Sequence, residues 1–301
     1  MSSSVRIAIV GGGLAGLAAA QALKAFGMKA EVFEAAPALC EIGAAVNISP
    51  QAVKALQAIG LGNEVAAVGT ASPGSYTRNM QTGDFLEFHD RHKAGQRFGA
   101  PYYTFHRADL LDALASGLDR NAIHLGHRMS GIEERNDHVM LAVENGACAE
   151  AEYLIGADGV RSVIRQALYG ADNPTYTGQM VWRALLNSSD VPFEAIEPTG
   201  HVQWVGPGCH LLAYYIRGNK LVKPRRTPIN GSRKAGRPAA IPMRCGIIRI
   251  LLAAGLSVAA TTWPLAAGGQ QARQMRRIGT TDGAIRTGLL LALKEWRIAC
   301  P

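Results

Sequence analysis

The sequence lacks the features that define several classes of protein. Its 301 residues include only five cysteines, which are widely spaced and form no C-x-x-C pair. A disulfide-rich fold and a cysteine-based metal site are therefore not expected, and the cysteines are predicted to be free thiols. The first residues lack the basic region and long apolar core of a secretory signal, which favours a cytoplasmic protein. No spacing typical of a metal cluster, a nucleophile triad or paired carboxylates is present.

Acidic residues are scarce in one part of the chain. Residues 1–222 carry 17 Lys plus Arg and 21 Asp plus Glu. Residues 223–301 carry 14 Lys plus Arg but only 2 Asp plus Glu. A basic segment can bind nucleic acid or an anionic membrane, but this one has neither helical charge patterning nor interleaved aromatic residues. Residues 247–267 are long and apolar, yet they contain Arg249 and Pro264, which weaken a membrane span. We therefore expect neither a nucleic-acid nor a membrane partner.

A nucleotide-binding pattern begins the chain. Residues 5–10 predict an apolar strand, residues 11–16 read G-G-G-L-A-G and begin a helix, and residues 30–34 predict a second strand that ends in an acidic residue. This is a G-x-G-x-x-G motif within a βαβ unit. The pattern therefore predicts a doubly wound α/β domain that binds a dinucleotide.

Each residue of this motif has a physical role. Gly11 allows the tight turn, Gly13 lets the backbone approach a pyrophosphate, and Gly16 lets the helix pack closely on the strand. The free amides at the start of the helix, including those of Leu14 and Ala15, suit the phosphates. Glu34 is expected to accept a hydrogen bond from a ribose hydroxyl and would repel a 2′-phosphate.

Further along, strand patterns belong to a second sheet. Residues 74–88 alternate about a Thr-Gly-Asp turn, which predicts an antiparallel hairpin. Residues 107–118 predict a helix, and residues 153–155 predict a strand that leads into G-A-D-G. Strand-like runs separated by Pro and Gly return between residues 180 and 221. The two sheets are therefore interleaved along the chain.

Four stretches of the chain resemble the FAD-dependent aromatic hydroxylases that use NAD(P)H, particularly the salicylate hydroxylase and 3-hydroxybenzoate 6-hydroxylase group. They are G-G-G-L-A-G-L-A-A-A with its following Glu34, G-A-A-V-N-I-S-P-Q-A, F-H-R-A-D-L-L and I-G-A-D-G-V-R-S-V-I-R. The resemblance implies an α/β fold in which a Rossmann-type FAD-binding domain, residues 1–72 and 101–175, is interleaved with a mixed β-sheet substrate domain. That second domain, residues 73–100 and 176–222, would be incomplete at its C-terminal end.

The resemblance also assigns residues to FAD. It implies that Arg107 contacts the phosphate and ribityl region, and that Asp158 and Gly159 lie near the pyrophosphate. It implies that the backbone at Gly43 and Ala45 passes beside the flavin ring. From the residues alone, Asp158 can also be an N-cap for a helix that begins at Val160.

On the second sheet the resemblance places an aromatic substrate over the flavin. Arg183, His210 and Tyr214 are the candidates for contact with it, although His210 and Tyr214 can also be ordinary packed strand residues. The implied reaction uses FAD, NADH or NADPH, and O2 to hydroxylate a phenolic acid. The alternatives are a flavin-dependent reductase or dehydrogenase that uses no oxygen, and a non-catalytic remnant. The oligomeric state stays open.

The resemblance ends at Lys223, where the charge balance changes, and no G-D-A-A-H string follows it. Codons chosen for residues 224–253 and read from the third base can encode A-A-H-T-D-Q-W-Q-P-E-S-W-S-T-R-G-D-P-D-A-V-R-D-Y-S-D-F-A-G, which resembles the continuation of the family. The hypothesis is that residues 223–301 are a poorly ordered, out-of-frame basic tail, from a frameshift or a sequence error, and that function is impaired. An evolved basic module is the competing hypothesis.

Overall fold

The computed structural model describes residues 3–39, 45–171, 174–175, 181–191, 196 and 200–228. The chain divides into two compact units. Unit 1 comprises Met1–Cys40, Ala55–Ala67 and Ala108–Thr175, and unit 2 comprises Glu41–Lys54, Val68–Arg107 and Tyr176–Pro301. The chain thus passes between the units several times, as the interleaved fold predicts. The domain limits given above stay a prediction.

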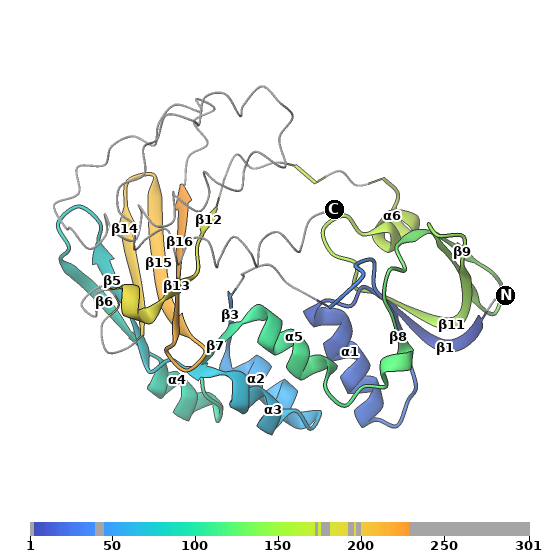
Figure 1. The fold of residues 1–301 in the computed structure, drawn as a ribbon, viewed down its shortest axis with the longest axis horizontal. Coiled ribbons are helices and arrows are strands. Elements are labelled where there is room, and N and C mark those ends of the chain that lie inside the picture. The colour runs from blue at the N-terminus through green and yellow to red at the C-terminus, as the bar shows by residue number, and fades with distance from the viewer. Residues whose placement is uncertain are drawn as a thin grey trace. The chain divides into compact units, whose positions relative to one another are not determined.

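Unit 1 is built on a six-stranded sheet in the order β8-β2-β1-β11-β10-β9 (Figure 1). Four neighbouring strands are parallel: β8 (Ile123–His124), β2 (Glu31–Phe33), β1 (Ser3–Val10) and β11 (Cys148–Gly156). The remaining strands, β10 (Val139–Val143) and β9 (Met129–Glu134), continue the sheet antiparallel. Ile9 packs in one hydrophobic cluster, whereas Ala8 and Val10 pack in another. Because both faces are covered in the second half of β1, residues 7–10 form a continuous apolar run.

Helices connect the strands of both units along the described part of the chain. They are α1 (Leu14–Ala25), α2 (Pro50–Ala58), α3 (Gly62–Val68), α4 (Arg91–Phe98), α5 (Arg107–Ala115) and α6 (Val163–Tyr169), with 3-10 turns at Arg120–Ala122 and Ser188–Asp190. Within unit 1, Gln21 of α1 donates hydrogen bonds of 2.7 Å to the carbonyls of Leu114 and Ser116. A buried amide side chain thereby satisfies carbonyls at the C-terminal end of α5, which the helix itself leaves free.

Unit 2 contains a mixed sheet of seven strands (Figure 1). Its main order is β12 (Trp182–Arg183), β16 (Leu221–Pro228), β15 (Cys209–Ile216), β14 (His201–Gly206), β5 (Gly74–Asn79) and β6 (Phe85–Asp90), and β13 (Leu186–Asn187) also pairs with β16. Among the described pairs of this sheet, only β14 and β5 are parallel. The hairpin predicted at residues 74–88 is confirmed as β5 and β6. A smaller sheet joins β3 (Ala45–Ile48), β7 (Tyr103–His106) and β4 (Thr70–Ala71).

The large sheet of unit 2 has two different faces. On β15, Cys209, Leu211 and Ala213 belong to the hydrophobic core of this unit. Because side chains alternate along a strand, His210 and Tyr214 point to the opposite face. The sheet therefore has one apolar face and one face that carries polar and aromatic side chains.

Strand β16 extends past Lys223, the position at which the family resemblance ends in the sequence. It lies between β15 and the short strands β12 and β13, although it contains Pro224 and ends at Pro228. Proline has no amide hydrogen and is normally confined to edge strands, strand starts and bulges. Residues 229–301, with most of the basic segment and the apolar run at 247–267, lie outside the described residues. No helix of the described part is long and apolar enough to cross a membrane.

Candidate functional site

The glycine-rich turn lies at the carboxyl end of β1. Gly11 has a φ of +105°, and its amide donates a 2.8 Å hydrogen bond to the Phe33 carbonyl. A Cβ atom at Gly11 would lie 2.3 Å from the Ala157 carbonyl oxygen, and a Cβ atom at Gly16 would lie 1.8 Å from that of Gly11. Close packing therefore requires glycine at both positions, and the positive φ requires it at Gly11 as well.

Gly13 differs from these two glycines, because its surroundings leave room for a side chain. A Cβ atom at Gly13 would meet no described atom within 4 Å. Gly13 is the N-cap of α1, no described side chain caps this end, and the first turn contains no acidic residue. The first amides of a helix have no intrahelical partner, so those of Leu14 and Ala15 are available to an anion. An open approach beside uncapped amides fits the pyrophosphate of a dinucleotide.

Glu34 follows β2, next to this turn. One carboxylate oxygen accepts a 2.5 Å hydrogen bond from the Gly12 amide, and the other accepts a 2.7 Å hydrogen bond from the Ala36 amide. The side chain thus tethers the glycine-rich turn to the end of β2. A carboxylate can accept about four hydrogen bonds, so acceptor capacity for a ribose hydroxyl is left.

Asp158 lies beside Gly11, whose added Cβ would approach the Asp158 amide to 2.9 Å. Its carboxylate caps a helix, but that helix begins at Val163, three residues after the predicted start at Val160. Asp158 Oδ2 accepts hydrogen bonds from the amides of Val163 at 2.7 Å and Ile164 at 3.3 Å, and Oδ1 accepts one from the Ser162 hydroxyl at 2.6 Å. The later start follows from Ser162, which is the N-cap of α6: its ψ of 119° is not helical, and its hydroxyl accepts a hydrogen bond from the Arg165 amide.

Two more FAD candidates lie in unit 2. Ala45 begins β3 and pairs with His106, so it lies close to Arg107, the first residue of α5. The structure therefore brings Ala45 and Arg107 together from positions far apart in the sequence. Gly43 lies outside the described residues.

The three substrate candidates share one face of the large sheet. His210 and Tyr214 alternate along β15, and Arg183 pairs with Arg225, which in turn pairs with Leu212 between them. Register partners point to the same side of a sheet. Arg183 is exposed, and burial together with the charge of Arg225 lowers the pKa of His210.

Tyr214 is 4% exposed, and its hydroxyl makes no hydrogen bond with any described residue. Burial raises the pKa of Tyr214 to about 12, against the opposing effect of Arg225, Arg183 and Arg91. The phenol is therefore protonated at neutral pH. The hydroxyl oxygen is not among the buried polar atoms that lack a partner, so this end of a largely buried side chain is open to a ligand.

The surroundings of Tyr214 include residues that no sequence pattern indicated. The His201 ring stacks on it, with 5.3 Å between ring centroids and 14° between planes. Arg91 lies 3.2 Å from His201 Nε2 and stacks 4.0 Å above the Tyr102 ring. These residues come from β14, the start of α4 and the segment before β7, so only their tertiary packing brings them together.

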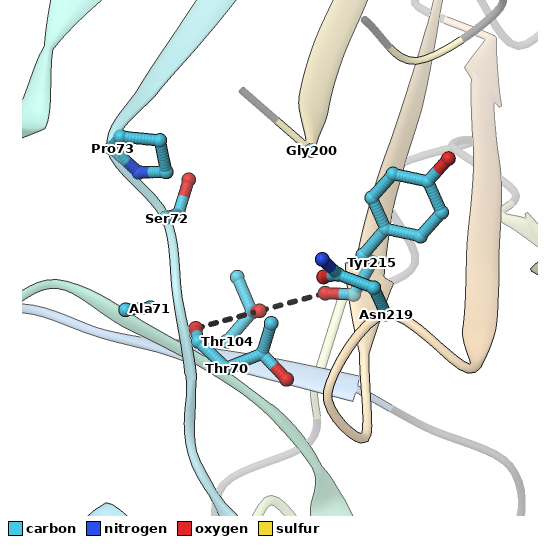
Figure 2. A pocket seen from close by; sticks show the side chains of 8 residues that line it. All are labelled: Thr70, Ala71, Ser72, Pro73, Thr104, Gly200, Tyr215 and Asn219. Carbon is cyan, nitrogen blue, oxygen red and sulfur yellow. Dashed lines mark hydrogen bonds between the residues drawn. The ribbon is translucent and has the colours of Figure 1, made fainter. Parts of the chain in front are cut away.

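A small pocket of about 60 Å³ also lies in unit 2 (Figure 2). At its floor, the Thr104 hydroxyl lies 2.7 Å from the Tyr215 carbonyl and 3.2 Å from the Thr70 carbonyl (Figure 2). The volume holds a few water molecules and is far too small for a substituted benzene ring. This pocket is therefore not the aromatic site.

Comparisons with known proteins agree with this geometry. The family described as FAD binding domain matches residues 4–208. The 3-amino-4-hydroxybenzoate 2-monooxygenase of Streptomyces cremeus is 38% identical over 243 residues, which cover 77% of this chain and 60% of that protein. The 3-hydroxybenzoate 6-hydroxylase of Polaromonas naphthalenivorans (strain CJ2) is 35% identical over 226 residues, covering 71% of this chain and 54% of that protein.

A solved structure shares the fold. The crystal structure of Klebsiella pneumoniae HpxO complexed with FAD and uric acid is similar with a TM-score of 0.68 and 25% identity, covering 75% of this chain and 57% of that one. The chain spans less than two thirds of the length of these relatives. The resemblance inferred from the four sequence stretches is confirmed, and the cofactor of this fold is FAD. The chain belongs to the FAD binding domain family.

Proposed function

We propose that this protein is an FAD-dependent aromatic hydroxylase. It converts a phenolic acid, NADH or NADPH, a proton and O2 into the ring-hydroxylated acid, the oxidised nicotinamide and water. The observation that carries the proposal is the uncapped N-terminus of α1 beside the open approach at Gly13. The names of the relatives, both of which hydroxylate benzoates, support the substrate class. The proposed partners are a small aromatic acid and O2, and the proposed location is the cytoplasm.

The residues that hold FAD follow from the site. The amides at the start of α1 would bind the pyrophosphate, because the helix dipole favours an anion there. Glu34 would accept a hydrogen bond from the ribose, and Arg107 would donate to the phosphate and ribityl region with its fixed fork of donors. Asp158 and Gly159 would line the pyrophosphate side and Ala45 would pass beside the flavin, as the resemblance also implies for Gly43, which lies outside the described residues. Bound FAD supplies the electron transfer and the oxygen chemistry.

Substrate contact falls to the polar face of the large sheet. Tyr214 stays protonated at neutral pH and donates its hydrogen bond to the phenolic oxygen of the substrate. Arg183 supplies positive charge for the carboxylate, and the neutral imidazole of His210 accepts the proton of the phenol.

The test starts from the visible spectrum of the purified protein. Bound FAD should give a yellow protein that oxidises NADH or NADPH and consumes O2 in step with a hydroxylated product from 3-hydroxybenzoate or a related acid. Oxidation of the nicotinamide without hydroxylated product would identify a flavin-dependent reductase instead. Protein that binds no FAD would contradict the proposal.

A second candidate, a non-catalytic remnant, is favoured by strand β16. Lys223 is 2% exposed, and Pro224 lies in a central strand. Arg225 lies directly opposite Arg183, and its Nε atom is buried without a hydrogen-bond partner among the described residues. Like charges opposite each other and an unsatisfied donor both destabilise a sheet. Such a strand is expected of a segment translated out of frame.

Mass spectrometry separates the two candidates. Intact mass and tail peptides would be measured on protein expressed from the native gene, and a frame-restored version would be expressed beside it. If the peptides match the written tail and only the restored version binds FAD and hydroxylates, the written chain is a remnant. If the written chain itself is yellow and active, the remnant is excluded.

A further inference from the structure

Arg91 is a partly buried cation near the polar face of the large sheet. It is the first residue of α4, where the neighbouring Asp90 carboxylate caps the helix by accepting from the Lys93 amide at 3.1 Å. No carboxylate of the described residues forms an ion pair with Arg91. Instead it donates to the Ser72 hydroxyl at 2.8 Å, lies 3.2 Å from His201 Nε2, and stacks on Tyr102. Because the contacts of the Arg91 guanidinium are neutral groups, its charge has a role other than forming a surface salt bridge.

The contact between Arg91 and His201 fixes the state of the imidazole. A guanidinium can only donate hydrogen bonds, so Nε2 must present its lone pair and the proton must reside on Nδ1. His201 is 3% exposed. Burial, with a smaller contribution from Arg91, lowers the pKa of His201 to about 3. The ring is therefore neutral and held in one tautomer at every pH at which an enzyme of this kind works.

His201 in turn holds Tyr214. The two residues are register partners on β14 and β15, and their rings are stacked nearly parallel. Arg91 fixes the orientation of the His201 ring through Nε2. Because the Tyr214 ring stacks on the face of that imidazole, the orientation of the imidazole also fixes the orientation of the Tyr214 ring. The Tyr214 hydroxyl, which has no partner among the described residues, is then presented in a single direction.

We infer that Arg91 is a positioning residue that acts through His201 to hold Tyr214 for a hydrogen bond to the phenolic oxygen of the substrate. This inference rests on the proposed function. Arg91 does not touch the reacting atoms. Its positive charge also raises the electrostatic potential at Tyr214, which favours an anionic phenol ring in that place.

The experiment compares the full chain, with FAD added, as wild type, Arg91→Gln and the matched control Lys93→Gln, whose side chain is 83% exposed on the same helix. Nitrogen NMR of the imidazoles should show one neutral His201 tautomer in wild type and control. In Arg91→Gln it should show mixed tautomers and a small upward shift of the titration, because burial, the larger cause of the lowered pKa, remains. The Kd for 3-hydroxybenzoate, measured by calorimetry, should rise about tenfold in Arg91→Gln, as expected for a misplaced contact. In the loaded enzyme kcat should fall more than KM rises.

A second variant tests the same link from the other side. His201→Phe keeps a ring beside Tyr214 but cannot accept from Arg91, so its Kd should rise by a similar factor. The double variant should bind 3-hydroxybenzoate no more weakly than either single variant, because both substitutions remove the same contact between Arg91 and His201. This measurement stands even if Arg91→Gln does not fold.

Two results would overturn the inference: an unchanged His201 tautomer and Kd in folded Arg91→Gln, or strictly additive losses in the double variant. A stability loss alone, with tautomer and Kd unchanged, would likewise overturn it and give Arg91 a purely structural role. Absence of hydroxylation in wild type would count against the proposed function and not against this inference, because the tautomer and the Kd are measured without turnover.

Discussion

Two helices of unit 1 begin just beyond the carboxyl ends of neighbouring parallel strands, and their first turns are built in opposite ways. Helix α1 follows β1 and has no capping side chain among the described residues. Helix α6 follows β11, and its first amides are bonded by Asp158 and Ser162. The same backbone geometry is thus either satisfied by the protein itself or left open for an anion. Of these two helix ends, the α1 end, where Gly13 opens to free space, is the one suited to hold the pyrophosphate.

The largest expected effect is from Gly16→Ala, which removes the close packing that aims α1. The new Cβ would overlap the Gly11 carbonyl oxygen, since the two atoms would lie 1.8 Å apart. We expect a loss of about 3 kcal/mol or more in the free energy of unfolding, measured by urea titration, together with loss of FAD binding. Gly131→Ala, whose Cβ would meet no described atom within 4 Å, is the control. Equal stability of the two variants would contradict the packing argument.

Gly13→Asp should make α1 resemble α6. A carboxylate at the N-cap would satisfy the free amides, so the thermal midpoint of the FAD-free protein should rise, by the equivalent of about 1 kcal/mol. The same carboxylate would repel the pyrophosphate, and the Kd for FAD should rise by about a hundredfold or more. Flavin fluorescence titration measures it. Unchanged FAD affinity would place the pyrophosphate elsewhere.

Asp158→Ala is the reverse change, because it removes the carboxylate that caps the first amides of α6. The loss of hydrogen bonds to the amides of Val163 and Ile164 should lower the free energy of unfolding by about 1–2 kcal/mol, measured by urea titration. Asp158→Asn, which retains an acceptor oxygen, should recover most of it. If the free energy of FAD binding falls by more than the free energy of unfolding in both variants, Asp158 also contacts the cofactor.

The smallest effect is expected from Ser162→Ala. This variant removes one cap, the 2.9 Å hydrogen bond from the Arg165 amide, but leaves Asp158 in place. The free energy of unfolding should fall by about 0.5–1 kcal/mol, and FAD affinity, measured by fluorescence titration, should not change. A change in FAD affinity would show that α6 also contributes to the site.

Local patterns predicted much of unit 1. The glycine spacing, the apolar strand before it and Glu34 after it are close together in the chain, so their geometry follows from short-range backbone constraints. The predicted start of α6 was wrong by three residues, because Ser162 is the N-cap and Asp158, four residues before it, bonds the Val163 amide, which the sequence pattern did not distinguish. Strand β16 could not be predicted from K-P-R-R-T-P, since its partners β15 and β12 impose the extended conformation.

The nucleotide-binding motif is encoded locally, because Gly11, Gly13 and Gly16 act through the backbone of one turn and the helix that it begins. The alternation of side chains along a strand is also readable in the sequence, and it places His210 and Tyr214 on one face. The meeting of Arg91 and His201 with Tyr214 arises from tertiary packing instead. That contact depends on the register of β14 with β15 and on the position of α4, and neither is encoded by the spacing of these residues along the chain.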